Sequence, residues 1–384
     1  MSSDSNVPAH LAQAIPTIDL AAIVSNWRLL RDRVAPAQCA AVVKANAYGA
    51  GIAPVARALA DAGCKTFFVA HVHEALALRR VLPREEYVIY TLNGIAGGRE
   101  AAIALRDSLL RPVIGTFEEL ALWRSLSGTS ANPALPMALQ FSTGMNRLGF
   151  APREAGDVTQ VLATVAGPQP DFVMSHFVSS EIPDDPMNPA QIAAFAEIRS
   201  HFPALAGSLA NSSGIFLPPE PYCDLVRPGY ALYGGNPTPG LPNPMQPVVQ
   251  LQAPVLQVRH VQPGETAGYN GVWTAKRPSR LAVIGVGYAD GFLRSAGGPS
   301  DPGVAMIGGT ACPIAGRVSM DLLILDATDA PEKAVHAGAR AELLGAAITI
   351  DDLAERAGTI GYEILTGLGA RYHRRYVSAS GTTE

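Results

Sequence analysis

A lysine in an apolar run is the residue of this chain with the clearest potential for chemistry. Lys44 lies in the run Ala-Ala-Val-Val-Lys-Ala (residues 40–45) and is followed by Asn-Ala-Tyr-Gly. Burial lowers the pKa of a lysine because the charged form loses hydration, and the resulting neutral amine attacks carbonyl carbon. The alternative is a strand-end lysine whose stem lies on apolar surface while its ammonium reaches solvent. The first interpretation predicts a Schiff-base lysine at the carboxyl end of a strand.

Two later segments combine small residues with donors suited to an anion. They are Asn211-Ser212-Ser213-Gly214 and Arg227-Pro228-Gly229-Tyr230. Small residues let backbone N–H groups approach a phosphate closely, and hydroxyl and guanidinium groups add further donors. The two segments therefore predict a phosphate site, although Asn-Ser-Ser-Gly is also an ordinary helix cap.

The elements that must position these residues alternate along the first two-thirds of the chain. Short apolar runs alternate with amphipathic segments such as 52–62 and 74–81, whose spacing predicts helices. Eight strands alternating with helices favour a parallel (β/α)8 barrel of the TIM type over an open sheet. The expected strands cover residues 40–45, 66–70, 87–92, 112–115, 137–141, 172–175, 208–210 and 225–226.

The composition of the chain changes after residue 229. Residues 236–247 are rich in Pro, Gly and Asn, and short β-rich pieces punctuated by Gly and Pro follow them. We expect residues 12–240 to form the barrel and residues 241–384 to form a carboxyl-terminal β domain. Residues 1–11 are expected to pack with that domain or to be disordered.

In a parallel barrel, chemistry collects at the carboxyl ends of the strands. Lys44 and Tyr48 follow the first expected strand, Arg147 follows the fifth and His176 follows the sixth. The two anion-binding segments follow the seventh and eighth strands, where barrel enzymes often bind phosphate. A single histidine or arginine is usually structural. It is the shared location of these residues after the strands that indicates a site.

The overall composition restricts the class of function. The chain has 384 residues, 48% hydrophobic and 16% charged, with a formal net charge of -4. No basic run stands out, which argues against nucleic-acid or membrane-surface binding and favours a small-molecule partner. The amino terminus lacks the pattern of a secretory signal, and no apolar stretch is long enough to span a bilayer. Four scattered cysteines argue against a zinc site or a disulfide framework, so we expect no metal and a cytoplasmic location.

Several motifs, in order along the chain, resemble those of the alanine racemase family. The resemblance covers residues from about 15 to 376, and each motif alone is weak. The motifs are Ala-Val-Val-Lys-Ala-Asn-Ala-Tyr-Gly (41–49), Ser-Thr-Gly-Met-Asn-Arg-Leu-Gly (142–149), Asn-Ser-Ser (211–213), Val-Arg-Pro-Gly (226–229), Gly-Tyr-Ala-Asp-Gly (287–291), Gly-Arg-Val-Ser-Met-Asp (316–321) and Thr-Ile-Gly-Tyr-Glu (359–363).

The resemblance implies an isomerase that uses pyridoxal 5'-phosphate to interconvert L- and D-alanine. It also implies a homodimer whose active sites are shared between chains. Lys44 would form the Schiff base and act as one base, and Tyr269 of the partner subunit would act as the base on the opposite face. Racemisation removes a proton from one face and returns one to the other, so two opposed bases are the simplest solution.

The resemblance also assigns roles around the cofactor. Arg227 would face the pyridine nitrogen, where an always-charged guanidinium discourages protonation of the ring and favours simple proton exchange. Arg147 would lie near the phenolic oxygen and the substrate carboxylate, His176 beside the ring, and Met320 at the substrate carboxylate through its backbone. The remaining cofactor-binding positions are Tyr48, Asn211, Ser212, Gly229, Tyr230 and Tyr362, and the supporting positions are Gln140, Tyr288 and Asp321.

Four positions depart from the family's usual residues. Ala50 replaces a histidine, Ser142 an aspartate and Ser319 a cysteine, and none of them is an expected base. Gln140 stands where many members carry a carbamylated lysine that orients the arginine, here Arg147. An amide can accept a hydrogen bond from Arg147 but cannot supply the negative charge.

Substitutions at this lysine position also occur in racemases that accept a wider range of substrates. A racemase of broader amino-acid specificity, for example for serine or lysine, is therefore an open alternative. A decarboxylase of the same architecture is a weaker alternative, because it would carry a Cys-Asp pair where this chain has Ser319-Met320-Asp321 and would lack Tyr269. A non-catalytic cofactor-binding protein would typically be a barrel alone. Whether D-alanine is made for the cell wall or degraded is also open.

Overall fold

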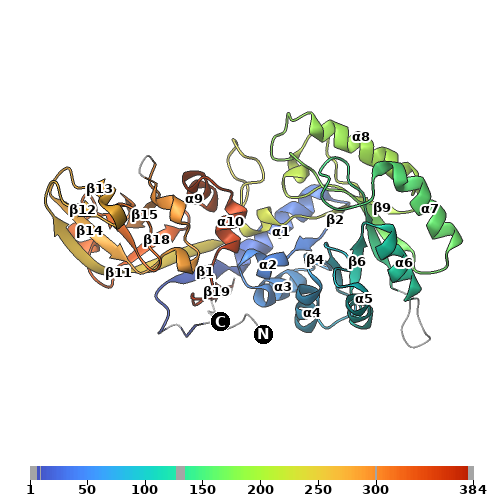
Figure 1. Cartoon of the computed structure of the whole chain (residues 1–384), viewed down its shortest axis with the longest axis horizontal. Helices are drawn as coiled ribbons and strands as arrows, with labels where there is room; N and C mark the ends of the chain where they lie inside the picture. The colour runs from blue at the N-terminus through green and yellow to red at the C-terminus, as the bar shows by residue number, and fades with distance from the viewer. Residues whose placement is uncertain (1–6, 9, 127–134, 299–300, 379–384) are drawn as a thin grey trace.

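The computed structural model describes residues 7–8, 10–126, 135–298 and 301–378. A barrel and a β-rich region lie side by side along the long axis (Figure 1). Most of residues 1–11, the segment expected to pack with the β domain or to be disordered, lie outside the described residues. None of the described helices has the length and apolar character needed to cross a lipid bilayer.

The barrel prediction is confirmed by the pairing of the strands. Strands β3 to β9 form a parallel sheet in sequence order, and β10 pairs with β2, which directly precedes β3. Backbone bonds from Asp224 N to Gly207 O (3.0 Å) and from Arg227 N to Ala210 O (2.9 Å) join β10 to the β9 segment and close the ring. The barrel strands are β2 (Gln38–Cys39), β3 (Ala41–Val42), β4 (Thr66–Val69), β5 (Val88–Thr91), β6 (Arg111–Ile114), β7 (Met137–Gln140), β8 (Pro170–Met174), β9 (Ala206–Ser208) and β10 (Leu225–Val226).

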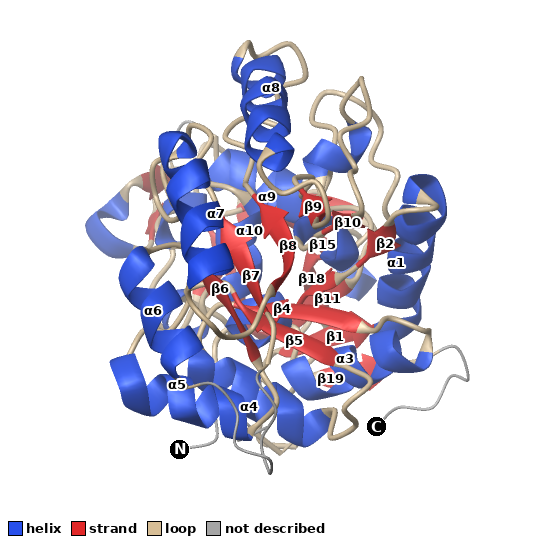
Figure 2. Ribbon diagram, turned by 90° about the vertical axis from the view of Figure 1, so that its right-hand side faces the viewer, coloured by secondary structure: helices blue, strands red, loops and turns tan. Residues whose placement is uncertain are grey.

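Helices surround these strands on the outside (Figure 2). Helix α3 illustrates the reason, since Val55, Ala56, Leu59 and Ala60 recur on one face and are buried. The strands are apolar almost throughout because parallel strands are covered on both faces. The barrel helices are α1 (Leu20–Val34), α3 (Ile52–Asp61), α4 (Val72–Val81), α5 (Gly98–Asp107), α6 (Phe117–Ser125), α7 (Ala155–Thr164) and α8 (Met187–Ser200), with short elements α2 (Lys44–Tyr48), η1 (Pro152–Glu154), η2 (Ser213–Phe216) and η3 (Tyr230–Tyr233).

The second region is built on a sheet of eight strands. Its main path runs β16-β15-β18-β11-β1-β19, and β14 joins β11 to β17. The strands are β1 (Ile15–Asp19), β11 (Val249–Val261), β14 (Ser279–Ile284), β15 (Val304–Ile307), β16 (Thr310–Pro313), β17 (Leu323–Asp326), β18 (Arg340–Leu344) and β19 (Arg375–Val377). The other elements are the hairpin β12 (Thr266–Ala267) and β13 (Trp273–Thr274), helices α9 (Ile350–Ala357) and α10 (Gly361–Thr366), and turns η4 (Tyr269–Gly271), η5 (Tyr288–Asp290), η6 (Arg294–Gly297) and η7 (Glu332–Ala334).

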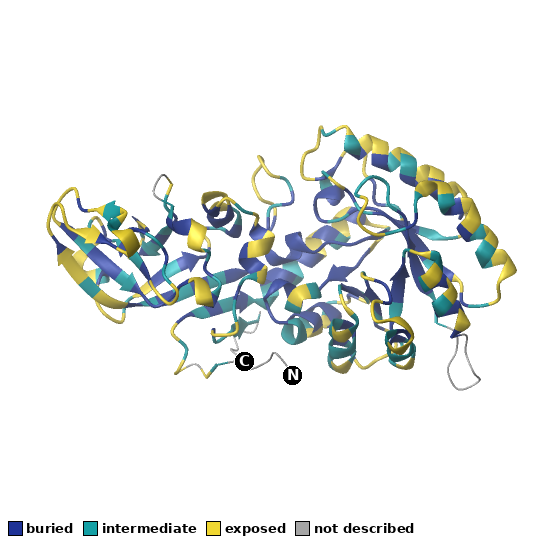
Figure 3. Cartoon of the chain, viewed as in Figure 1, coloured by how far each residue is buried: buried dark blue, intermediate teal, exposed yellow. Residues whose placement is uncertain are grey.

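One strand falls outside the expected division of the chain. β1 lies within residues 12–240, which were expected to form the barrel, but it pairs antiparallel with β11 and parallel with β19 of the second sheet. The chain then enters the barrel through α1, whose first turn is capped by Asp19, with Oδ1 accepting from Ala22 N at 2.9 Å. Buried residues run continuously from the barrel strands into this sheet (Figure 3). The two regions therefore share one apolar core.

Candidate active site

The predicted barrel residues follow the carboxyl ends of neighbouring strands. Lys44 comes after β3, Arg147 after β7, His176 after β8, Ser212 after β9 and Arg227 after β10. Electrostatic interactions link Lys44 with Arg147, and His176 with Lys44, Arg147 and Arg227. The barrel thus brings these five groups to one mouth.

The expected strand over residues 40–45 ends early because the chain turns sharply after Lys44. Ala45, Asn46, Ala47 and Tyr48 all have φ between 52° and 54°, so α2 is a left-handed turn. Left-handed backbone costs about 1–2 kcal/mol per non-glycine residue. The surrounding structure must offset this strain, as is common at functional sites.

Lys44 has the electrostatic character that its sequence context predicts. Its pKa lies below the ordinary value, first because of burial and then because of the nearby Arg147 guanidinium, while Glu74 acts in the opposite direction. A lower pKa increases the fraction of neutral amine, which is the nucleophilic form.

Arg227 is buried at the centre of the mouth with 4% of its surface exposed. It donates to the Ser175 carbonyl oxygen at 2.6 Å and to the Ser208 hydroxyl. Burial lowers its pKa to about 10, so the guanidinium stays charged at neutral pH. For His176, burial and then the positive charges of Arg227, Arg147 and Lys44 lower the pKa to about 3, which leaves a neutral imidazole.

Ser212, Gly229, Ala231 and Tyr48 form what we call the anion cradle. The Ser212 hydroxyl oxygen accepts from Gly229 N at 3.1 Å and from Ala231 N at 3.2 Å. A Cβ added at Gly229 would lie 2.3 Å from the Tyr48 hydroxyl oxygen, so only glycine allows this approach. Backbone N–H groups and two hydroxyls thus gather in a small space that suits a phosphate.

Aromatic rings from both regions pack behind the anion cradle. Tyr48 stacks on Tyr233 with ring centroids 4.7 Å apart, and Tyr230 stacks on Tyr362 of α10 at 4.1 Å. The Tyr230 hydroxyl donates to Asp351 Oδ1 of α9 at 2.6 Å. The β region therefore supports this side of the barrel mouth.

Asn211 and Gln140 hold loops in place. Asn211 Oδ1 accepts from Ser180 Oγ and from Gly214 N, each at 2.8 Å, and so fixes the turn that leads into η2. Gln140 Nε2 donates to the Leu148 carbonyl oxygen at 3.2 Å, and so supports the loop that carries Arg147.

Apart from Tyr362, the predicted residues of the β region are not gathered at the mouth in the same way. Tyr269 is 68% exposed on the hairpin β12–β13, which lies at the end of the molecule away from α2 (Figure 1). Met320 and Tyr288 are also exposed, and Tyr288 N donates to the Ser319 carbonyl oxygen at 3.0 Å. Asp321 accepts from Arg371 at 2.8 Å. A single chain therefore does not bring Tyr269 to Lys44.

Ala231 of the anion cradle and the Arg227 partners Ser175 and Ser208 were not predicted from the sequence. Three further residues that support the site were also not predicted. Tyr233 supports Tyr48, Asp351 binds Tyr230, and Glu74 accepts from the amide of Ala45 at 2.6 Å. Glu74 could have been noticed, since a glutamate near a helix start is a capping signal. Nothing local marks the other two.

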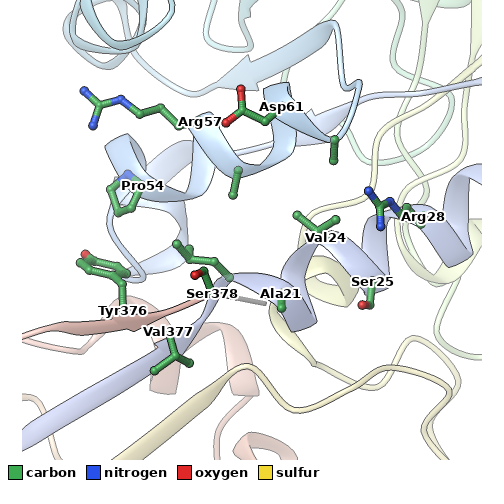
Figure 4. Close-up of a pocket in the computed structure, with 13 residues that line it drawn as sticks. Ala21, Val24, Ser25, Arg28, Pro54, Arg57, Asp61, Tyr376, Val377 and Ser378 are labelled. Carbon is green, nitrogen blue, oxygen red and sulfur yellow. The ribbon is translucent and has the colours of Figure 1, made fainter. Parts of the chain in front are cut away.

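A separate pocket of about 590 Å³ lies between α1, α3 and β19 (Figure 4). Arg28, Arg57 and Asp61 line this pocket, together with apolar residues such as Val24. None of the predicted site residues lines it.

Fold and site together define a barrel enzyme with a lysine and an anion cradle at its mouth and an accessory β region. The chain belongs to the alanine racemase family. The family's model described as "Alanine racemase, N-terminal domain" matches residues 18–237, and that described as "Alanine racemase, C-terminal domain" matches residues 248–376.

Individual relatives agree over nearly the whole chain. An alanine racemase of Methylobacterium nodulans is 52% identical, covering 95% of this chain and 96% of its own length. An alanine racemase of another Methylobacterium strain is 51% identical, covering 94% and 97%. The crystal structure of alanine racemase from Bartonella henselae with covalently bound pyridoxal phosphate is 40% identical, with a TM-score of 0.87 and coverage of 95% of this chain and 100% of that chain.

Proposed function

We propose that this protein is a pyridoxal 5'-phosphate-dependent alanine racemase that interconverts L- and D-alanine in a homodimer with shared active sites. The observation that carries the proposal is a lysine of lowered pKa at the barrel mouth beside the anion cradle and the buried Arg227. Membership of the alanine racemase family supports the same conclusion.

The residues at the mouth fit this cofactor. The amine of Lys44 suits its aldehyde, and the N–H groups and hydroxyls of the anion cradle suit its phosphate. Arg227 would provide a fixed positive charge for the ring nitrogen. Burial is the main cause of its lowered pKa, the Cys223 thiol opposes that shift, and no carboxylate contributes to it. Neutral His176 suits contact with the face of the ring.

When bound, the cofactor supplies the electron withdrawal that makes the α-proton of an amino acid acidic. Arg227 would limit that withdrawal, because the permanent charge of a guanidinium near the ring nitrogen would discourage its protonation. Weaker withdrawal favours return of the proton over other fates of the substrate. Arg147, which is exposed at the mouth, would bind the substrate carboxylate.

Two proton carriers act on opposite faces of the substrate. Lys44 Nζ accepts or returns the proton on one face, and its lowered pKa favours the accepting form. Tyr269 of the partner subunit acts on the other face, with the Met320 backbone of the partner subunit near the carboxylate. The exposure of Tyr269 and Met320 in the single chain supports this division, because both are available to a second chain.

The proposal is tested by incubating the protein with the cofactor and L-alanine in deuterated water. We expect D-alanine carrying deuterium at the α-carbon, and its formation should depend on Lys44. Release of carbon dioxide would instead indicate a decarboxylase. A chiral assay that compares L-serine and L-lysine with L-alanine tests how many amino acids the substrate pocket accepts.

A further inference from the structure

Glu74 connects the turn after Lys44 to the start of helix α4. Its Oε1 accepts from Ala45 N at 2.6 Å, while Oε2 accepts from Ala70 N at 2.8 Å and from His71 N at 3.0 Å. One half-buried carboxylate therefore binds the backbone amide of Ala45, next to Lys44, and also caps helix α4.

The turn needs such support because its backbone is strained. Ala45 is the first of five successive residues with left-handed φ, four of which are not glycine. It is also exposed, so packing of its methyl group does not hold it. A hydrogen bond to a charged acceptor is about twice as strong as a neutral one. The carboxylate of Glu74 also lies close enough to Lys44 to interact with its charge.

We propose that Glu74 is a positioning residue for Lys44, whose carboxylate holds the Ala45 amide and keeps the left-handed turn in the form that presents the lysine at the barrel mouth. The proposal rests on the proposed function only in that Lys44 is the attachment point of the cofactor. Glu74 acts through the turn and is not itself a proton carrier.

Another glutamate of the barrel provides a matched control. Glu119 lies in the first turn of α6, and its oxygens accept from Ile95 N at 2.8 Å and from Gly115 N at 3.1 Å. It is also half-buried and ties a helix start to the loop after the preceding strand. Its loop carries none of the predicted site residues, so it makes the same kind of bonds without the proposed task.

The test compares Glu74→Gln and Glu119→Gln in cofactor-free protein. Affinity for pyridoxal 5'-phosphate is titrated by visible absorbance, and thermal unfolding is followed in parallel. Loss of a hydrogen bond to a charged group should weaken cofactor binding by Glu74→Gln about 10- to 100-fold. The cofactor affinity of Glu119→Gln should stay within about twofold of that of the wild type, although both variants should lose comparable thermal stability.

Ala45→Gly separates positioning from helix capping. Glycine adopts positive φ without steric cost, so the Glu74→Gln/Ala45→Gly double variant should recover at least about threefold of the lost affinity, after correction for Ala45→Gly alone. Capping of α4 by itself would not respond to a change at Ala45. If Glu74→Gln does not fold, Glu74→Asp serves the same test, because the shorter carboxylate cannot reach Ala45 and α4 together.

Equal loss of affinity in the Glu74 and Glu119 variants, or no recovery with Ala45→Gly, would overturn the inference. Failure of the proposed function looks different, because wild-type protein would then bind no cofactor in the same titration.

Discussion

The proposed division of the active site between two chains can be tested by mixing inactive variants. Lys44 lies at the barrel mouth, whereas Tyr269 is 68% exposed on the hairpin β12–β13, at the end of the β region away from α2 (Figure 1). Lys44→Ala removes one of the two proposed proton carriers, and Tyr269→Phe removes the hydroxyl of the other. Each homodimer should therefore be strongly impaired, since neither retains a complete pair.

The size of the recovery follows from the symmetry of a dimer. When equal amounts of the two chains assemble at random, about half of the dimers contain one chain of each kind. One site of such a dimer combines the intact Lys44 with the intact Tyr269, and the other site carries both substitutions. We therefore expect about one quarter of wild-type activity above the homodimer background.

The assay co-expresses the two chains with different tags and measures D-alanine formation in the mixture and in dimers purified through both tags. The doubly tagged fraction should reach about half of wild-type activity, because each dimer has one complete site. Lys44→Ala combined with Arg227→Ala is the control. Both positions belong to the same barrel, so no site in that mixture is complete.

Absence of recovery in the first pair would refute the shared site, as would equal recovery in the control pair. Doubly tagged dimers must be detected in both mixtures by native mass spectrometry, so that lack of assembly is not mistaken for lack of complementation.

Three further predictions concern the mouth and its support. Gly229→Ala should weaken cofactor binding by about 1–3 kcal/mol in titration, because its Cβ would lie 2.3 Å from the Tyr48 hydroxyl oxygen. The pKa of His176 is about 3 in the folded protein against 6.5 ordinarily, so the unfolded state binds the proton first, and stability falls as pH drops from 6.5 toward 3. Thermal unfolding of His176→Gln should show a smaller loss of stability than wild type between pH 6.5 and pH 3. Asp351→Ala should lower stability by about 1–3 kcal/mol, because the Tyr230 hydroxyl loses its acceptor.

Matched substitutions control these measurements. Gly156 lies in α7 with no atoms near an added Cβ, so Gly156→Ala should leave cofactor affinity unchanged and stabilise the helix by up to about 1 kcal/mol. Glu355→Ala lies on the same helix as Asp351 at an exposed position and should change stability by less than about 0.5 kcal/mol. A Gly229 or Asp351 effect no larger than that of its control would contradict the packing argument. For His176, the same loss of stability in wild type and variant would contradict the assigned pKa.

The location of the mouth was predictable because strand order alone decides it. Apolar runs alternate with helical segments, and a parallel barrel places whatever follows each strand at one end. Lys44, Arg147, His176, Ser212 and Arg227 could therefore be assigned to one site. The pKa of Lys44 could be anticipated in direction as well, since apolar neighbours in the sequence indicate burial.

The course of β1 and the support behind the anion cradle depend on packing between distant parts of the chain. Ile15–Asp19 resembles any short strand, and only the tertiary structure pairs it with β11 and β19. The stack of Tyr230 on Tyr362 and the bond to Asp351 join residues more than a hundred positions apart. Such contacts leave no periodic signal in the sequence.

The sequence by itself determined the alternation of elements, the place of Lys44 after the first barrel strand and the family's motifs, because these depend on local order. Only the tertiary structure decided that Lys44 is followed by a left-handed turn, that Glu74 holds its amide, and that Tyr269 lies away from the lysine of its own chain. The physical reason is that backbone strain and long-range hydrogen bonds depend on which surfaces meet, and that is set by the packing of the whole chain.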